Sequence, residues 1–98
     1  MSKALTLIVD IHAKSEHRQL VRETLAALAR ETVKEAGNLC YRLHEVDDDP
    51  DQFVIYEQWK DKAALDFHMK QEYLVAFLAQ EERLLSKRIA GKFCREMS

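Results

Sequence analysis

Apolar and polar positions alternate at the start of the chain, where residues 5–11 read Leu-Thr-Leu-Ile-Val-Asp-Ile. This period of two, together with the β-branched residues, predicts a strand. From Ser15, which we expect to cap a helix, the apolar positions recur every three or four residues as far as Ala36. The spacing predicts one long amphipathic helix over Ser15–Ala36, with Gly37 as the residue that ends it.

Two further strands are predicted next, over Asn38–Val46 and from Gln52 to about Trp59. Four aspartates and a proline fill the polar link between them, residues 47–51, so the two strands should form an antiparallel hairpin. Along the second of these strands, every other residue from Phe53 to Trp59 shares one face, and Glu57 lies on it.

A second helical region is expected from Asp61, as its cap, to about Leu85, with His68 on the same face as Leu65. Because no glycine or proline interrupts this region, the sequence leaves open whether residues 69–73 break the helix. A final strand is expected over Lys87–Glu96.

The predicted order is β-α-β-β-α-β, the pattern of a ferredoxin-like α+β fold. Such a fold has a four-stranded antiparallel sheet with both helices on one face. At 98 residues, the chain is expected to form a single domain, residues 1–98.

The first and third strands carry apolar residues on both faces, including Ile8, Val54 and Tyr56. The face of such a sheet that lies away from the helices is usually polar. We therefore expect a second copy of the chain to cover this face, which predicts a homodimer of stacked sheets.

Charge and hydropathy exclude several classes of function. Fifteen Lys and Arg residues against 17 Asp and Glu leave no basic surplus to neutralise phosphates, so no nucleic-acid partner is expected. No apolar run approaches the roughly 20 residues of a transmembrane helix. The apolar stretch at residues 5–11 is also too short and too polar for a signal peptide. We expect no membrane association and a cytoplasmic location.

The two cysteines, Cys40 and Cys94, form no CxxC pair. In the expected topology they lie on opposite edges of the sheet, about 14 Å apart at about 4.8 Å per strand, which is too far for a disulfide. His12 and His17 lack the spacing of metal ligands, so no metal site is expected.

Short motifs follow one another in a specific order: Gly37-Asn38-Leu39-Cys40-Tyr41, Phe53, Glu57-Gln58-Trp59, Ala64-Leu65 and His68. In this order and spacing, the chain resembles the antibiotic biosynthesis monooxygenase family of dimeric α+β-barrel proteins over about residues 5–95. The resemblance implies oxygenation of quinols or polyphenols, in some members without metal, flavin or haem. Haem-degrading relatives use an asparagine on the first strand, where this chain has Thr6.

His68 is the candidate catalytic base. If its helix folds back over the sheet, the imidazole comes to lie near Glu57, on the face that also carries Trp59. A neutral imidazole can take a phenolic proton, and we expect the Glu57 carboxylate to fix its tautomer. The alternatives are that His68 only bonds a backbone carbonyl, that Glu57 caps a helix or pairs with an arginine of the partner, and that Trp59 only packs.

Five residues are expected to bind the substrate. Trp59, Phe77 and Tyr73 would form walls, Asn38 would contact an oxygen atom, and Tyr41 would line the site. Asn38 could instead only stabilise the turn after Gly37, and Tyr41 could only pack in the dimer interface.

The sequence thus favours a cofactor-independent monooxygenase that oxidises a small quinol or polyphenol-type aromatic with dioxygen. A non-catalytic dimeric module that binds a small ligand or a protein is the alternative, and a haem-degrading monooxygenase is a third possibility.

Overall fold

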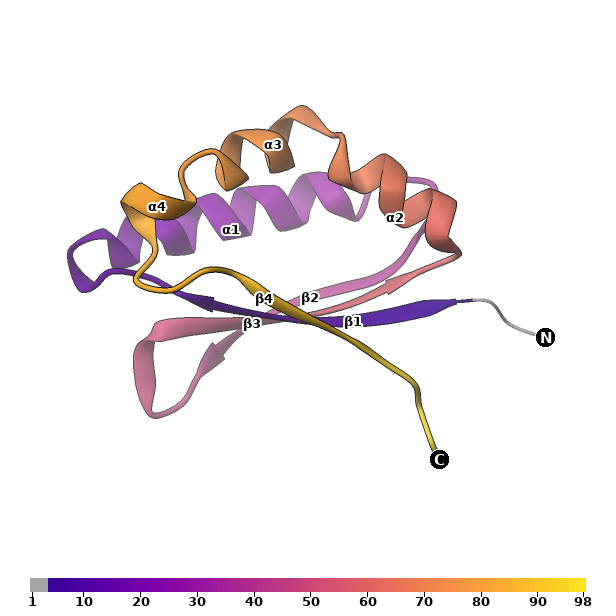
Figure 1. The fold of residues 1–98 in the computed structure, drawn as a ribbon, viewed down its shortest axis with the longest axis horizontal. Coiled ribbons are helices and arrows are strands. Elements are labelled where there is room, and N and C mark those ends of the chain that lie inside the picture. Colours follow the sequence, from indigo (N-terminus) through magenta and orange to yellow (C-terminus); the bar gives the residue numbers. More distant parts are fainter. Residues whose placement is uncertain (1–3) are drawn as a thin grey trace.

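The structure, a computed structural model, describes residues 4–98. Its elements in chain order are β1 (Leu5–His12), the 3₁₀ turn η1 (Ser15–His17), α1 (Arg18–Thr32), β2 (Asn38–Val46), β3 (Asp49–Trp59), α2 (Lys62–Met69), α3 (Glu72–Leu78), α4 (Glu81–Leu84) and β4 (Ala90–Cys94). The sheet order is β2-β3-β1-β4, and all neighbouring strands are antiparallel. The helices cover one face of the sheet and leave the other open (Figure 1). The predicted ferredoxin-like fold is confirmed.

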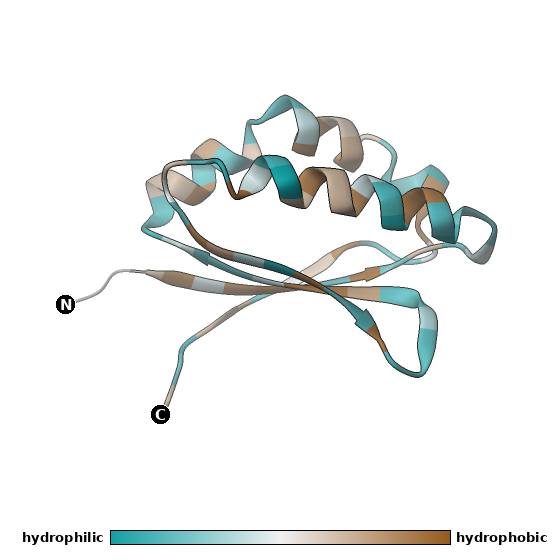
Figure 2. Cartoon of the chain, turned by 180° about the vertical axis from the view of Figure 1, so that it is seen from behind, coloured by the Kyte–Doolittle hydropathy of each residue, from teal (hydrophilic) through white to brown (hydrophobic). Residues whose placement is uncertain are grey.

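The hydrophobic core lies between α1 and the sheet. Leu25 and Leu28 on α1 face Ile11 and Phe53 on the central strands, and all four are almost fully buried. Figure 2 shows the apolar positions of α1 turned toward the sheet. The apolar face of the helix and the apolar face of the strands, both predicted from their periods, therefore pack against each other in one layer.

The first helix is shorter than predicted at both ends. Ser15 does not cap it; the Ser15 hydroxyl instead donates a hydrogen bond of 2.6 Å to Asp51. At the other end, the helix stops at Thr32, and the N–H groups of Lys34 and Glu35 then bond the third residue back rather than the fourth. Gly37 is therefore not the helix-ending residue, and its φ is not positive.

The second helical region is three helices, not one. Asp61 caps α2 as predicted, accepting a bond of 2.9 Å from the Ala64 N–H. The chain then leaves the helix at Lys70, and Gln71 is extended before α3 begins. Extended backbone is open to any residue, so no glycine or proline was needed to mark this break.

The hairpin and the last strand also differ from their predicted bounds. The turn is reduced to residues 47 and 48, because β3 begins at Asp49 rather than at Gln52. The last strand covers Ala90–Cys94, and every residue in it is exposed at the sheet edge.

The two cysteines lie in one row across the sheet. Cys40 is opposite Gln58, Gln58 opposite Thr6, and Thr6 opposite Cys94. Both thiols are free. The predicted placement at opposite edges is confirmed.

Within residues 4–98, none of the helices has the length and apolar character that crossing a bilayer requires.

Candidate functional site

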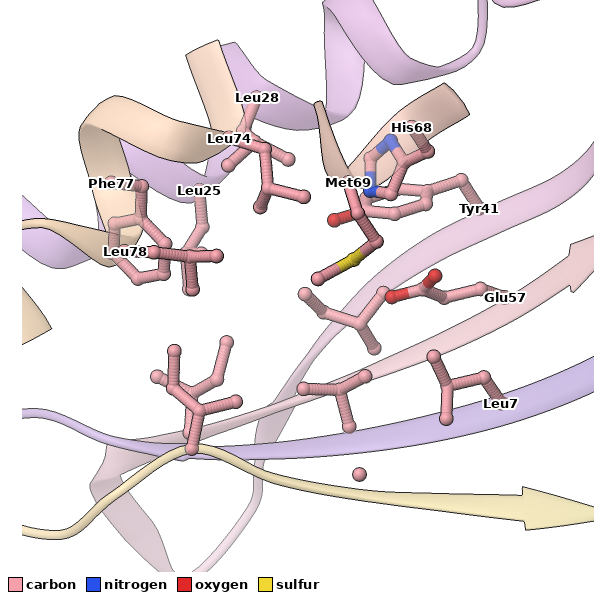
Figure 3. A pocket seen from close by; sticks show the side chains of 15 residues that line it. Leu7, Leu25, Leu28, Tyr41, Glu57, His68, Met69, Leu74, Phe77 and Leu78 are labelled. Carbon is pink, nitrogen blue, oxygen red and sulfur yellow. The ribbon is translucent and has the colours of Figure 1, made fainter. Parts of the chain in front are cut away.

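A cavity of about 190 Å³ lies between the helices and the sheet. Most of its lining is apolar, and the polar side chains of Tyr41, Glu57 and His68 gather at one end (Figure 3). The opposite end is formed by Leu25, Leu74, Phe77 and Leu78.

His68 projects into this cavity from α2. Its side chain is 3% exposed, and its Nδ1 atom lies 2.8 Å from Oε2 of Glu35. Glu35 sits in the connection between α1 and β2 and does not line the cavity. Because Nδ1 is directed at Glu35, Nε2 is the ring nitrogen left for a ligand, and no residue within 4–98 hydrogen-bonds it. The imidazole is thus hydrogen-bonded through Nδ1, while Nε2 is available to a ligand.

A second residue also hydrogen-bonds the Glu35 carboxylate. The hydroxyl of Tyr73 on α3 donates a hydrogen bond to the same oxygen, Oε2. The other oxygen, Oε1, is buried and has no hydrogen-bond partner within residues 4–98. Burial raises the pKa of Tyr73, and its bond to Glu35 adds to that effect, so Tyr73 stays a neutral donor.

Glu57 and Trp59 form a second buried pair beside His68. The Trp59 indole N–H donates a bond of 2.8 Å to Oε1 of Glu57. The Trp59 ring also packs against the His68 ring, with centroids 4.5 Å apart. Burial raises the pKa of Glu57, and the indole hydrogen bond only partly offsets this. The expected meeting of these three side chains is confirmed.

The expected role of Glu57 as the partner that fixes His68 was wrong. The carboxylate hydrogen-bonded to the imidazole is Glu35, while the hydrogen bond to Glu57 comes from Trp59. The tight turns after Thr32 bring Glu35 to His68 across 33 positions of sequence. No periodic pattern marks such a connecting residue, so periodicity could not indicate Glu35.

Tyr41 lines the cavity from β2, and its ring centroid is 6.1 Å from that of His68. Burial raises the pKa of Tyr41, and the nearby charge of Glu57 acts in the same direction. Tyr41 therefore presents a neutral hydroxyl at the polar end of the cavity.

The remaining candidates divide between the cavity and the structure around it. Phe77 lines the cavity, as expected. Trp59 and Tyr73 do not line the cavity. Trp59 packs against His68, and Tyr73 donates a hydrogen bond to Glu35. Asn38 lies outside the lining, and its amide donates to the carbonyls of Cys40 and Gln58 at 3.1 and 3.4 Å. Its side chain is thus occupied in fixing the start of β2.

Met69 also lines the cavity, although no sequence pattern marks it as a site residue. It follows His68 as the last residue of α2, and its side chain lies beside the polar end (Figure 3). Among residues 4–98, no group of three or more histidine, cysteine or acidic side chains is arranged to hold a metal ion.

Comparison with known proteins gives a consistent result. The family model "Antibiotic biosynthesis monooxygenase" matches residues 4–80. The Bacillus subtilis (strain 168) protein named "Putative monooxygenase YcnE" is 34% identical over 82 residues, which cover 84% of this chain and 86% of that protein.

Solved structures share the fold over nearly the whole chain. The crystal structure of PA3566 from Pseudomonas aeruginosa superposes with a TM-score of 0.93 at 35% identity, covering 100% of this chain and 98% of that one. A crystal structure described as an antibiotic biosynthesis monooxygenase has a TM-score of 0.89 at 26% identity, covering 96% of this chain and 99% of that one.

Proposed function

The chain belongs to the antibiotic biosynthesis monooxygenase family, and from this premise we propose that it is a homodimeric, cofactor-independent monooxygenase. Its substrate is a small quinol or polyphenol-type aromatic, and its oxidant is dioxygen. The observation that carries the proposal is a buried imidazole at the polar end of an otherwise apolar cavity.

The reaction balances without any further redox partner. A hydroquinone and dioxygen give a hydroxyquinone and water: one oxygen atom enters the ring, the other leaves as water, and the ring supplies all four electrons. The protein must remove a phenolic proton, because the electron-rich anion reduces dioxygen far more readily than the neutral quinol does. It must also exclude bulk water from the reactive intermediates.

The polar end of the cavity supplies groups suited to these tasks. Nε2 of His68 accepts the phenolic proton, and the neutral Tyr41 hydroxyl donates a hydrogen bond to an oxygen of the substrate. Glu57, which also faces the cavity, is positioned to accept a bond from a second substrate hydroxyl. The apolar end, with Phe77, holds the hydrocarbon part of the ring and keeps water out.

The cavity volume restricts the size of the substrate. An apolar cavity of about 150 Å³ accommodates benzene, so one of about 190 Å³ suits a single ring with small substituents. A haem group is far larger. Thr6, at the position where haem degraders carry asparagine, lies on the open face of the sheet and is bonded to Gln58. These two observations weigh against the haem-degrading alternative.

The open face of the sheet supports the homodimer. Ile8 is exposed there, and Val54 and Tyr56 are half-buried. An apolar face of this kind is covered when two sheets stack. The partners are thus a second copy of the chain, the aromatic substrate and dioxygen, and we expect a cytoplasmic location.

Oxygen consumption tests the proposed function. The purified protein is mixed with freshly reduced benzoquinones, naphthoquinones and anthraquinones, with autoxidation measured in parallel without protein. We expect protein-dependent oxygen uptake that is fastest with a one-ring quinol, with one oxygen atom of labelled dioxygen found in the product. Quinol binding without oxygen uptake would contradict the proposal and support the non-catalytic binding module.

A further inference from the structure

Within residues 4–98, Glu35 is the one buried carboxylate that bonds the imidazole directly, yet it lies outside the cavity. Its side chain is 6% exposed, and its only hydrogen bonds within residues 4–98 pass through Oε2, to His68 and Tyr73. The Tyr73 hydroxyl donates to the same carboxylate oxygen as the imidazole and so helps to fix the carboxylate. A group placed in this way can act on a substrate only through His68.

The hydrogen-bonding chemistry sets the protonation of the ring. An ionised carboxylate only accepts hydrogen bonds, so the contact of 2.8 Å requires the proton to be on Nδ1. In a neutral imidazole, Nε2 then carries the lone pair. We infer that Glu35 is the positioning residue of the site: it holds His68 in the Nδ1–H tautomer and so makes Nε2 the proton acceptor inside the cavity.

Glu35 also stabilises the charge that proton transfer creates. When Nε2 takes the phenolic proton, the neutral imidazole becomes an imidazolium and the quinol becomes an anion. The carboxylate 2.8 Å from Nδ1 then faces a positive ring in a poorly solvated environment, where the attraction is stronger than in water. This second effect rests on the proposed function, whereas the tautomer does not.

The tautomer is measured first, without any substrate. Long-range ¹H–¹⁵N NMR at about pH 9, where an ordinary histidine side chain is neutral, shows which ring nitrogen carries the proton. The signals of His68 are assigned from a His68→Gln variant. We expect the proton on Nδ1 and an unprotonated Nε2. A proton on Nε2 in the wild-type protein would overturn the inference whatever the activity.

Glu35→Leu then removes every acceptor at this position, and Glu31→Leu is the matched control. Glu31 is also an acid near the end of α1, but it is half-exposed and pairs with Lys34 rather than with His68. We expect Glu35→Leu to spread the proton over both ring nitrogens and to lower kcat about 10-fold or more. Glu31→Leu should change neither. Glu35→Gln, whose amide oxygen can still accept from Nδ1, should largely restore the wild-type tautomer.

The outcomes separate this inference from the proposed function. If the wild-type protein shows the Nδ1–H tautomer but consumes no oxygen with any quinol, the proposed function fails and the structural role of Glu35 stands. If Glu35→Leu keeps both the wild-type tautomer and the wild-type rate, the positioning role is wrong while the monooxygenase activity stands. Should Glu35→Leu fail to fold, the wild-type and Glu35→Gln spectra still decide the tautomer.

Discussion

Gly37 lies against Ala64 so closely that a β-carbon on residue 37 would stand 2.3 Å from the Ala64 β-carbon. The carbonyl of Gly37 also accepts a bond of 2.8 Å from the Lys60 N–H, just before α2. These contacts join the connection that carries Glu35 to the helix that carries His68. The absence of a side chain at residue 37 therefore allows the two groups to come within hydrogen-bonding distance.

Gly37→Ala should destabilise the fold by about 1–3 kcal/mol, the usual range for an extra carbon forced into a well-packed site. Gly91→Ala is the matched control, because its β-carbon would meet only the ends of the Leu7 and Val9 side chains, at 3.3 and 4.0 Å. Urea unfolding followed by circular dichroism measures both variants. Equal stability of Gly37→Ala and wild type would show that α2 does not pack tightly on this connection.

Glu57→Gln should stabilise the protein at neutral pH. The folded pKa of Glu57 is raised above its ordinary 4.5, so between these two values the folded state binds more protons than the unfolded chain. The stability that this group contributes below pH 4.5 is therefore lost as the pH rises through the folded pKa. Glutamine keeps an oxygen for the Trp59 indole N–H but carries no charge to bury.

The measurement is the free energy of unfolding of wild type and Glu57→Gln at pH 4 and pH 7. We expect the free energy of unfolding of Glu57→Gln to exceed that of wild type by more at pH 7 than at pH 4. The exposed residue Glu16 provides a control, Glu16→Gln, which should show no such difference. A gain that is the same at both pH values would contradict the burial of a charge at Glu57.

The sequence predicted the sheet and the cavity face because both follow from periodicity. Alternation along the strand that ends at Trp59 placed Glu57 on the helix-covered face, and the helical pattern after Asp61 placed His68 opposite it. Both placements depend on local geometry that repeats with a fixed period.

The carboxylate behind His68 could not be predicted in this way. Glu35 lies in a connection between α1 and β2, and its contact with His68 depends on where α1 ends and on how closely Gly37 meets Ala64. Neither the end of α1 nor the contact between Gly37 and Ala64 produces a periodic pattern in the sequence. The sequence left the break at Gln71 open for a related reason, because an extended residue needs no special side chain.

The homodimer can be tested by light scattering at micromolar concentration. We expect about twice the chain mass of 11.5 kDa. Val54→Lys places a charge in the middle of the open sheet face and should give monomers. Val33→Lys, at a residue 54% exposed on the helical side, should remain dimeric. A monodisperse wild-type monomer would contradict the model of stacked sheets.

The thiols give a simple check on the strand order. Cys40 and Cys94 lie on opposite edge strands with two strands between them. Thiol titration of denatured protein, never exposed to reductant, should find two free thiols per chain. An intrachain disulfide would require a different strand order.

The role of His68 as the base is tested by the rate of quinol-dependent oxygen consumption of the His68→Ala variant. A positioned base contributes about 10²–10⁴-fold, so the variant should lose at least about 100-fold near neutral pH. His17→Ala, which changes a histidine outside the cavity, should retain the wild-type rate. The ratio of wild-type to His68→Ala rates should shrink at high pH, where the quinol ionises without help. A folded His68→Ala protein that consumes oxygen at the wild-type rate would show that His68 is not the base.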